Sequence, residues 1–192
     1  MMKRLLLFSF AFVLHGQTSF TGTLSNGTVG TTASTSTCGN NAAGGGGSES
    51  GNVNYAMGNN GCTPSANVTV QSCSIVLDLG GTGNLSCAVY ATSTGASSGT
   101  PTGAPLCSSG SVAATGTGTN TLPLSGCGTL TSGTNYAIVW GTDTSANGIS
   151  KSTTSETAGF YQSSTFPTYP SGGTWTSYSP AQQYRLWLNV IP

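Results

Sequence analysis

The sequence predicts an all-β protein, an antiparallel β-sandwich of the jelly-roll-like type that is held together by disulfides. Short segments of alternating polarity recur along the chain, and Gly, Pro and Asn separate them at a spacing typical of strand turns. No segment of useful length shows the helical period of about 3.6 residues. The six cysteines are an even set, and they follow an N-terminal segment typical of exported proteins.

The N-terminus has the order of a secretory signal peptide. Lys3 and Arg4 precede an apolar run from Leu5 to Leu14, which is too short to cross a bilayer. We therefore expect a signal peptide over residues 1–16. The expected location is secreted, in the extracellular space or at the cell surface, with no membrane insertion after the signal is removed.

Residues 17–50 are rich in Gly, Ser and Thr and contain few apolar anchors, so we expect a leader or linker with room for one early strand. The β-sandwich domain is expected over residues 51–192. Its final strand alternates cleanly in polarity, which indicates a position inside a sheet. The expected strands are Val53–Met57, Asn67–Leu79, Leu85–Thr92, Leu106–Ala114, Thr119–Leu124, Tyr136–Gly141, Gly148–Thr153, Gly159–Gln162 and Gln183–Ile191.

Hairpin register narrows the many ways of pairing six cysteines. A turn at residues 116–118 places one pair of cysteines directly opposite each other, at a distance that suits a disulfide. A second pair becomes diagonal neighbours across a Gly-Gly-Thr-Gly turn, and the third pair follows by elimination. The expected pairs are Cys107 with Cys127, Cys73 with Cys87 and Cys38 with Cys62.

The strand that begins at Tyr136 carries two large aromatic residues after a Ser-Gly turn. Its alternation puts Tyr136, Ile138 and Trp140 on one face, and Ala137 and Val139 on the other. A tyrosine at such a position commonly locks the corner of a sandwich through its hydroxyl. We therefore interpret Tyr136 and Trp140 as structural residues of the core.

The order of several segments resembles a known family. The strands "CSIVLDL" and "LSCAVYATS" are followed by "GTPTGAPL", "GTLTSGTNYAIVWG" and "GGTWTSYSPAQQYRLWLNV". This order is similar to that of the secreted bacterial β-sandwich domains called choice-of-anchor domains, over roughly Val53 to Val190. The resemblance implies a jelly-roll-like module on exported surface proteins, beside anchors, adhesins or carbohydrate-active domains, without catalytic residues of its own.

Residues for catalysis or for metal binding are scarce. The only histidine, His15, lies in the expected signal peptide, so the mature chain has no imidazole for a catalytic triad or a typical zinc enzyme. The acidic residues are Glu49, Asp78, Asp143 and Glu156. Only the last two could form the carboxylate pair of a glycosidase, and we interpret them as solvated loop residues. We expect no enzyme activity, no metal site and no cofactor.

Charged residues make up 4% of the 192 residues, against about 25% in ordinary soluble domains. The four basic residues form no patch, so we expect no nucleic-acid partner. Hydroxyls, amides and backbone groups must therefore form the surface. Such a surface favours uncharged partners, either neutral glycans or further copies of the chain.

The loop region 160–178 is the expected ligand-binding site. Its aromatic residues lie among Ser, Thr and Gln, and neutral glycans are usually held by aromatic faces together with amide and hydroxyl hydrogen bonds. An alternative is that these aromatics form a lid over the open end of the sandwich. The expected ligand-binding residues are Tyr161, Gln162, Tyr169, Trp175 and Tyr178.

Two functions fit this sequence. The first is a secreted, non-catalytic module for surface adhesion or neutral-glycan binding. The alternative is a structural subunit of an extracellular or virion-associated assembly, which would pack against copies of itself through strand edges and an uncharged Thr-rich face.

Overall fold

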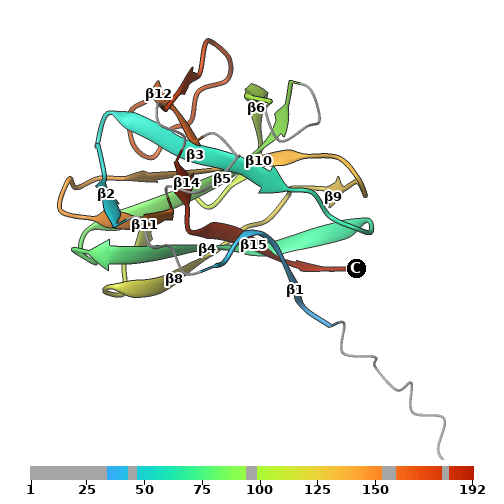
Figure 1. The fold of residues 1–192 in the computed structure, drawn as a ribbon, viewed down its shortest axis with the longest axis horizontal. Helices are drawn as coiled ribbons and strands as arrows, with labels where there is room; N and C mark the ends of the chain where they lie inside the picture. Colours follow the sequence, from blue (N-terminus) through green and yellow to red (C-terminus); the bar gives the residue numbers. More distant parts are fainter. Residues whose placement is uncertain (1–33, 43–46, 94–98, 153–158, 179–181) are drawn as a thin grey trace, which may run out of the picture. The chain divides into compact units, whose positions relative to one another are not determined.

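Two antiparallel β-sheets pack face to face in the computed structural model of the protein (Figure 1). The structure describes residues 34–42, 47–93, 99–152, 159–178 and 182–192, and these ranges contain no helix. All of them belong to the compact unit Ala33–Pro192. The predicted fold class, an all-β antiparallel sandwich with disulfides, is confirmed. The expected signal peptide lies outside the described residues.

The first sheet has eight strands and centres on β4, the longest strand. One edge of β4 pairs with β15 and β11, and the other edge pairs with β8 and β9. Beyond these, β1 pairs with β15, whereas β2 and β14 pair with β11. The strands are β1 (Ser36–Asn40), β2 (Ser48–Ser50), β4 (Val68–Leu79), β8 (Gly118–Pro123), β9 (Thr129–Leu130), β11 (Gly148–Ser152), β14 (Gln183–Tyr184) and β15 (Leu186–Ile191).

The second sheet has seven strands in the order β13-β12-β3-β10-β5-β6, and β7 also pairs with β5. Figure 1 shows it above the first sheet, with β3 and β10 in its middle. The strands are β3 (Tyr55–Cys62), β5 (Asn84–Thr92), β6 (Pro101–Ser108), β7 (Val112–Ala113), β10 (Tyr136–Thr142), β12 (Gly159–Ser163) and β13 (Thr176–Ser177).

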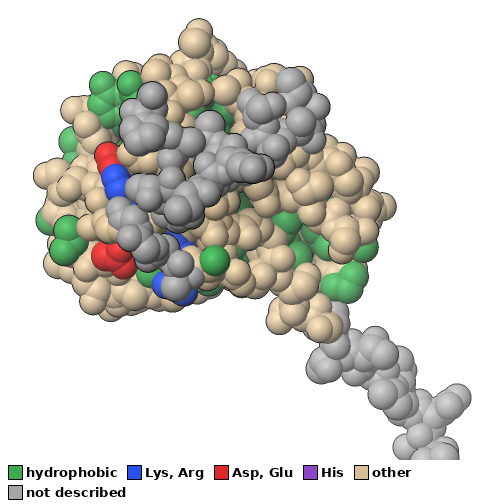
Figure 2. All heavy atoms as spheres, viewed as in Figure 1, with side chains coloured by type: hydrophobic (Ala, Val, Ile, Leu, Met, Phe, Trp, Pro, Cys, Tyr) green, Lys and Arg blue, Asp and Glu red, His purple; other side chains and the backbone are tan. Residues whose placement is uncertain are grey.

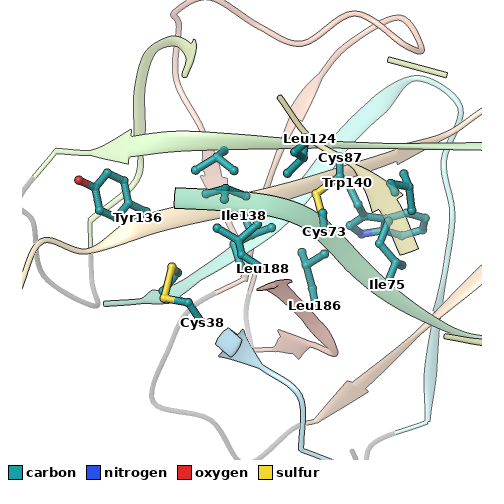
Figure 3. Close-up of a cluster of buried hydrophobic side chains, with 14 of the residues drawn as sticks. Cys38, Cys73, Ile75, Cys87, Leu124, Tyr136, Ile138, Trp140, Leu186 and Leu188 are labelled. Atoms are coloured by element: carbon teal, nitrogen blue, oxygen red, sulfur yellow. A yellow bond between two sulfur atoms is a disulfide. The ribbon is translucent and has the colours of Figure 1, made fainter. Parts of the chain in front are cut away.

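The core lies between the two sheets and is filled by the side chains at alternate strand positions that face inward. Leu186 and Leu188 of β15 point toward Ile138 and Trp140 of β10 (Figure 3). The expected interior position of the last strand is confirmed, since β15 lies between β1 and β4. Trp140 is fully buried, and the Tyr136 hydroxyl accepts a hydrogen bond of 2.9 Å from the backbone N–H of Thr131. The structural interpretation of both aromatics is therefore confirmed.

Two disulfides connect one sheet to the other, and the third ties β6 to the loop between β8 and β9. The cysteines on the side of the first sheet lie in β1, in β4 and after β8, and their partners lie in β3, β5 and β6. The bonds are Cys38–Cys62, Cys73–Cys87 and Cys107–Cys127, the same pairs that the sequence favours.

The expected hairpins behind two of these pairs are wrong. β4 and β5 lie in different sheets, as do β6 and β8, so neither disulfide closes a hairpin. A connection that crosses between sheets still brings inward-facing positions of successive strands together. The cysteine pairs therefore agree with the expectation, although the strand pairing does not.

The sandwich begins earlier than the expected boundary at residue 51. β1 pairs with β15 over its whole length and is bonded to β3 through Cys38, while β2 pairs with β11. Both strands lie in the segment expected to be a leader. Apolar periodicity misses them because Cys38 is the only buried side chain in β1, and β2 has none.

Removing the fully buried disulfide between β4 and β5 is expected to lower the free energy of unfolding. Its cysteines are 14 residues apart, and chain-entropy reasoning gives about 3 kcal/mol for a loop of this size. The double variant Cys73→Ala, Cys87→Ala tests this by urea unfolding of the oxidised protein. The comparison variant is Cys107→Ala, Cys127→Ala, whose loop of 20 residues gives a similar entropic loss but whose partly exposed site leaves a smaller cavity, so its total loss should be smaller. An unchanged unfolding free energy in the first variant would contradict the expectation.

Candidate functional site

The segment between β12 and β13, residues 164–175, forms a lid on the outer face of the second sheet (Figure 1). Trp175 and Tyr169 are only 7% and 9% exposed. The Trp175 ring meets those of Phe160 and Tyr90 edge to face, with centroids 5.3 and 5.6 Å apart. These side chains form a second apolar cluster with small residues of β3, β5 and β10. Two of the five expected ligand residues therefore belong to this cover.

Hydrogen bonds fasten the lid to the sheet. The Tyr169 hydroxyl donates to Ser86 Oγ over 2.8 Å, and the Tyr90 hydroxyl donates to the carbonyl of Pro170 over 2.7 Å. Burial raises the pKa of both hydroxyls, so they stay protonated and keep donating. Gln162 belongs to the same structure, since its Nε2 donates to the carbonyl of Gly172 over 2.8 Å. The lid covers the outer face of a sheet, whereas the alternative placed it over the open end of the sandwich.

Tyr161 and Tyr178 lie elsewhere, in a pocket of about 400 Å³ between β2 of the first sheet and β3, β12 and β13 of the second. We call it the tyrosine pocket. Its size lies within the range of small-molecule sites, about 300 to 1,000 Å³. It is lined by Glu49, Ser50, Asn52, Tyr55, Met57, Tyr161, Ser177 and Tyr178.

The aromatic rings of the pocket form a continuous series. The Tyr161 ring lies 5.5 Å from that of Tyr55 and 4.8 Å from that of Tyr178, centroid to centroid. The Tyr178 ring in turn meets that of Tyr184, which contacts Trp140 in the core. Burial raises the pKa of Tyr178, so its hydroxyl is neutral at physiological pH. The pocket therefore combines ring surface with uncharged hydroxyls.

The charge in the pocket is balanced. Glu49 Oε2 accepts a hydrogen bond of 2.6 Å from Lys151 Nζ, which also lies 3.5 Å from Gln182 Oε1. Among the described residues, the other carboxylate oxygen, Glu49 Oε1, has no hydrogen-bond partner. Figure 2 shows that uncharged atoms dominate the visible face, with only a few acidic and basic side chains.

Sequence reasoning missed several of these residues. Glu49 lies in the segment expected to be a leader, and it meets Lys151 across 102 positions of the chain. Tyr55 was expected in a strand, but its contact with Tyr161 depends on the pairing of β3 with β12. No local pattern carries this information.

One member of the candidate glycosidase pair, Glu156, lies outside the described residues. Asp143 has a structural contact instead. Its carboxylate accepts hydrogen bonds from the backbone N–H of Asn84 over 2.7 Å and from Asn84 Nδ2 over 2.6 Å. Within the described ranges, no group of three or more His, Cys, Asp or Glu residues could hold a metal ion.

No protein-family model, curated protein or solved structure matches the chain. The resemblance to choice-of-anchor domains therefore stays a prediction. In the part of the chain that the structure describes, no helix is both long enough and apolar enough to span a membrane.

Trp175→Ala is expected to destabilise the protein. The indole is buried between two aromatic rings, and removing a buried aromatic side chain typically costs about 3 to 5 kcal/mol. Urea unfolding measures the loss. Tyr161→Ala is the control, with a smaller expected loss because that ring is partly exposed. Equal stability of Trp175→Ala and the wild type would show that the lid does not depend on this side chain.

Asp143→Ala is expected to lower the free energy of unfolding at pH 7 by about 1 kcal/mol, a small value because the carboxylate is exposed. The backbone N–H of Asn84 holds the pKa of Asp143 below its usual value. The stabilisation is therefore present above the unfolded pKa of about 3.9 and disappears as pH falls through the lower folded pKa. Urea unfolding at several pH values tests this, with the exposed residue Asp78→Ala as control. A pH-independent loss would contradict it.

Proposed function

We propose that the protein is a secreted, non-catalytic module that binds neutral glycans in the tyrosine pocket. The observation that carries this proposal is the combination, in one pocket, of three tyrosine rings and a carboxylate whose charge is already balanced by Lys151. A charged ligand would find no unpaired opposite charge among the described residues that line the pocket. An uncharged ligand needs none.

The chemistry of the pocket suits a sugar. The apolar face of a sugar ring packs against aromatic rings, and its hydroxyls need donors and acceptors placed around that contact. Tyr161 lies in the middle of the aromatic series and supplies the ring surface. Glu49 Oε1 is available to accept from a sugar hydroxyl, while Asn52 and Ser177 offer amide and hydroxyl groups.

The disulfides support the expected location. Three disulfides, two of them formed by buried cysteines on both sides, need an oxidising compartment to form and persist. An extracellular or cell-surface location meets that need, and it would also expose the module to glycans.

The alternative assembly role receives less support from the strand edges of the second sheet. β6, at one edge of the second sheet, contains Pro101 and Pro105, and Gly103 between them has a positive φ of 66°. Proline has no N–H to donate, and an irregular backbone prevents continuous pairing with another strand. At the opposite edge, β13 is only two residues long. These features block growth of the second sheet by strand addition.

The test is calorimetric titration of the oxidised mature protein with a panel of soluble neutral oligosaccharides. We expect saturable binding to at least one, and Tyr161→Ala to weaken it by about tenfold or more, equivalent to about 1.4 kcal/mol. Tyr161→Phe is the matched control. It keeps the ring surface and should retain most of the affinity.

Thermal unfolding must show that both variants are folded. Absence of binding across the panel would overturn the proposed function. Equal affinity of Tyr161→Ala and the wild type would place the glycan site outside the tyrosine pocket.

A further inference from the structure

The ion pair of Lys151 and Glu49 lies on the inner side of the first sheet. Ile149 of β11 is fully buried in the core, and its register partner on β2 is Glu49. Lys151 lies two positions further along β11, opposite the fully buried Tyr184 of β14. Residues two positions apart share a face of the strand, and register partners lie side by side on that face. Both charged side chains therefore project from the side of the sheet that carries the core.

The two charges are only partly exposed to water. The side chain of Lys151 is 15% exposed and that of Glu49 is 28% exposed. Burial raises the pKa of Tyr178, and the negative charge of Glu49 raises it further. The carboxylate thus acts on a tyrosine that lines the pocket. A partly buried pair of this kind is screened less by salt than an exposed one.

Without Lys151, the lining of the tyrosine pocket would have the composition of a cation site. The rings of Tyr55, Tyr161 and Tyr178 border it together with the carboxylate of Glu49. The face of an aromatic ring attracts a cation, and groups of such rings commonly bind ammonium ligands. An unpaired carboxylate would add a full negative charge. Lys151 already provides an ammonium group to this carboxylate, at 2.6 Å from Glu49 Oε2.

We infer that Lys151 makes the tyrosine pocket reject cationic sugars and accept uncharged ones. Glu49 lines the pocket and Lys151 does not, so Lys151 is a positioning residue that acts through Glu49. A cationic ligand would meet a carboxylate that is already paired and a like charge behind it. An uncharged ligand meets no such penalty.

The consequence is a pocket that distinguishes two forms of one amino-sugar chain. The N-acetylated form is uncharged, whereas the form without acetyl groups carries ammonium groups. We expect the pocket to favour the acetylated form. That a sugar is the ligand rests on the proposed function, but the charge selectivity assigned to Lys151 does not.

A purely structural role for the ion pair is the competing explanation. In that case its purpose would be to hold the short strand β2 against β11. The backbones of these strands already pair over three residues, and the backbone N–H of Lys151 donates to the carbonyl of Gly47 over 2.9 Å. Neither contact needs the Lys151 side chain. A structural role also predicts no change in which ligand charge the pocket prefers.

The test is calorimetric titration of the oxidised mature protein with tetramethylammonium, and with the trimers of glucosamine and of N-acetylglucosamine. Lys151→Met removes the charge and keeps a long apolar side chain. We expect it to bind tetramethylammonium about tenfold or more tightly than the wild type does, because Glu49 is then unpaired beside three aromatic rings. Its preference between the two trimers should shift toward the glucosamine trimer.

Three further variants separate charge selectivity from other effects. Lys151→Arg keeps the charge and should gain no affinity for tetramethylammonium. The double variant Lys151→Met, Glu49→Gln should lose the gained affinity, because the carboxylate is also gone. Arg185→Gln is the matched control, since it removes the same charge from a residue outside the pocket lining and should leave the affinity for tetramethylammonium unchanged.

The inference is overturned if folded Lys151→Met gains no affinity for tetramethylammonium, or if the gain persists in the double variant. Equal gains in Arg185→Gln and Lys151→Met would also overturn it, since net charge alone would then explain the effect. If thermal unfolding shows that Lys151→Met is not folded, Lys151→Gln decides, because its amide can still donate to Glu49. A gain in Lys151→Met without affinity of the wild type for any neutral oligosaccharide would support the role of Lys151 while the proposed function fails.

Discussion

The contact between the two sheets is the constraint on which the rest of the structure depends. With so few charged residues, the chain has little to gain from ion pairs, and Lys151 with Glu49 is the only pair that the described residues form. Apolar packing around Trp140 and the three disulfides must therefore hold the sandwich (Figure 3). Because two disulfides link the sheets and the third ties β6 to the loop after β8, the two sheets keep the fixed positions on which the pocket between β2 and β12 depends.

Strand alternation then divides one aromatic-rich segment between two roles. Phe160 and Tyr161 are neighbours in β12, and they point to opposite sides of the sheet. Phe160 packs under Trp175 in the lid, whereas Tyr161 joins Tyr178 in the pocket. The outer faces of the two sheets are consequently treated differently: an apolar lid covers the second sheet, and hydrogen-bonded polar side chains cover the first.

Local pattern was sufficient for most strands and for the corner formed by Tyr136, because alternation and turn residues are encoded within a few positions. It failed where the outcome depends on which strands meet. The sequence around Cys73 and Cys87 reads equally well as a hairpin or as a crossing between sheets, and β1 is held by backbone pairing and one disulfide rather than by apolar residues. Local pattern cannot assign Glu49 and Tyr55 to the pocket for the same reason. Glu49 depends on the pairing of β2 with β11, and the contact of Tyr55 depends on the pairing of β3 with β12.

A surface with so few charges limits how the protein can recognise a ligand. Long-range attraction cannot steer a ligand to it, and specificity must come from shape and from hydrogen bonds at fixed positions. Fixed positions require a rigid frame, which the cross-sheet disulfides provide.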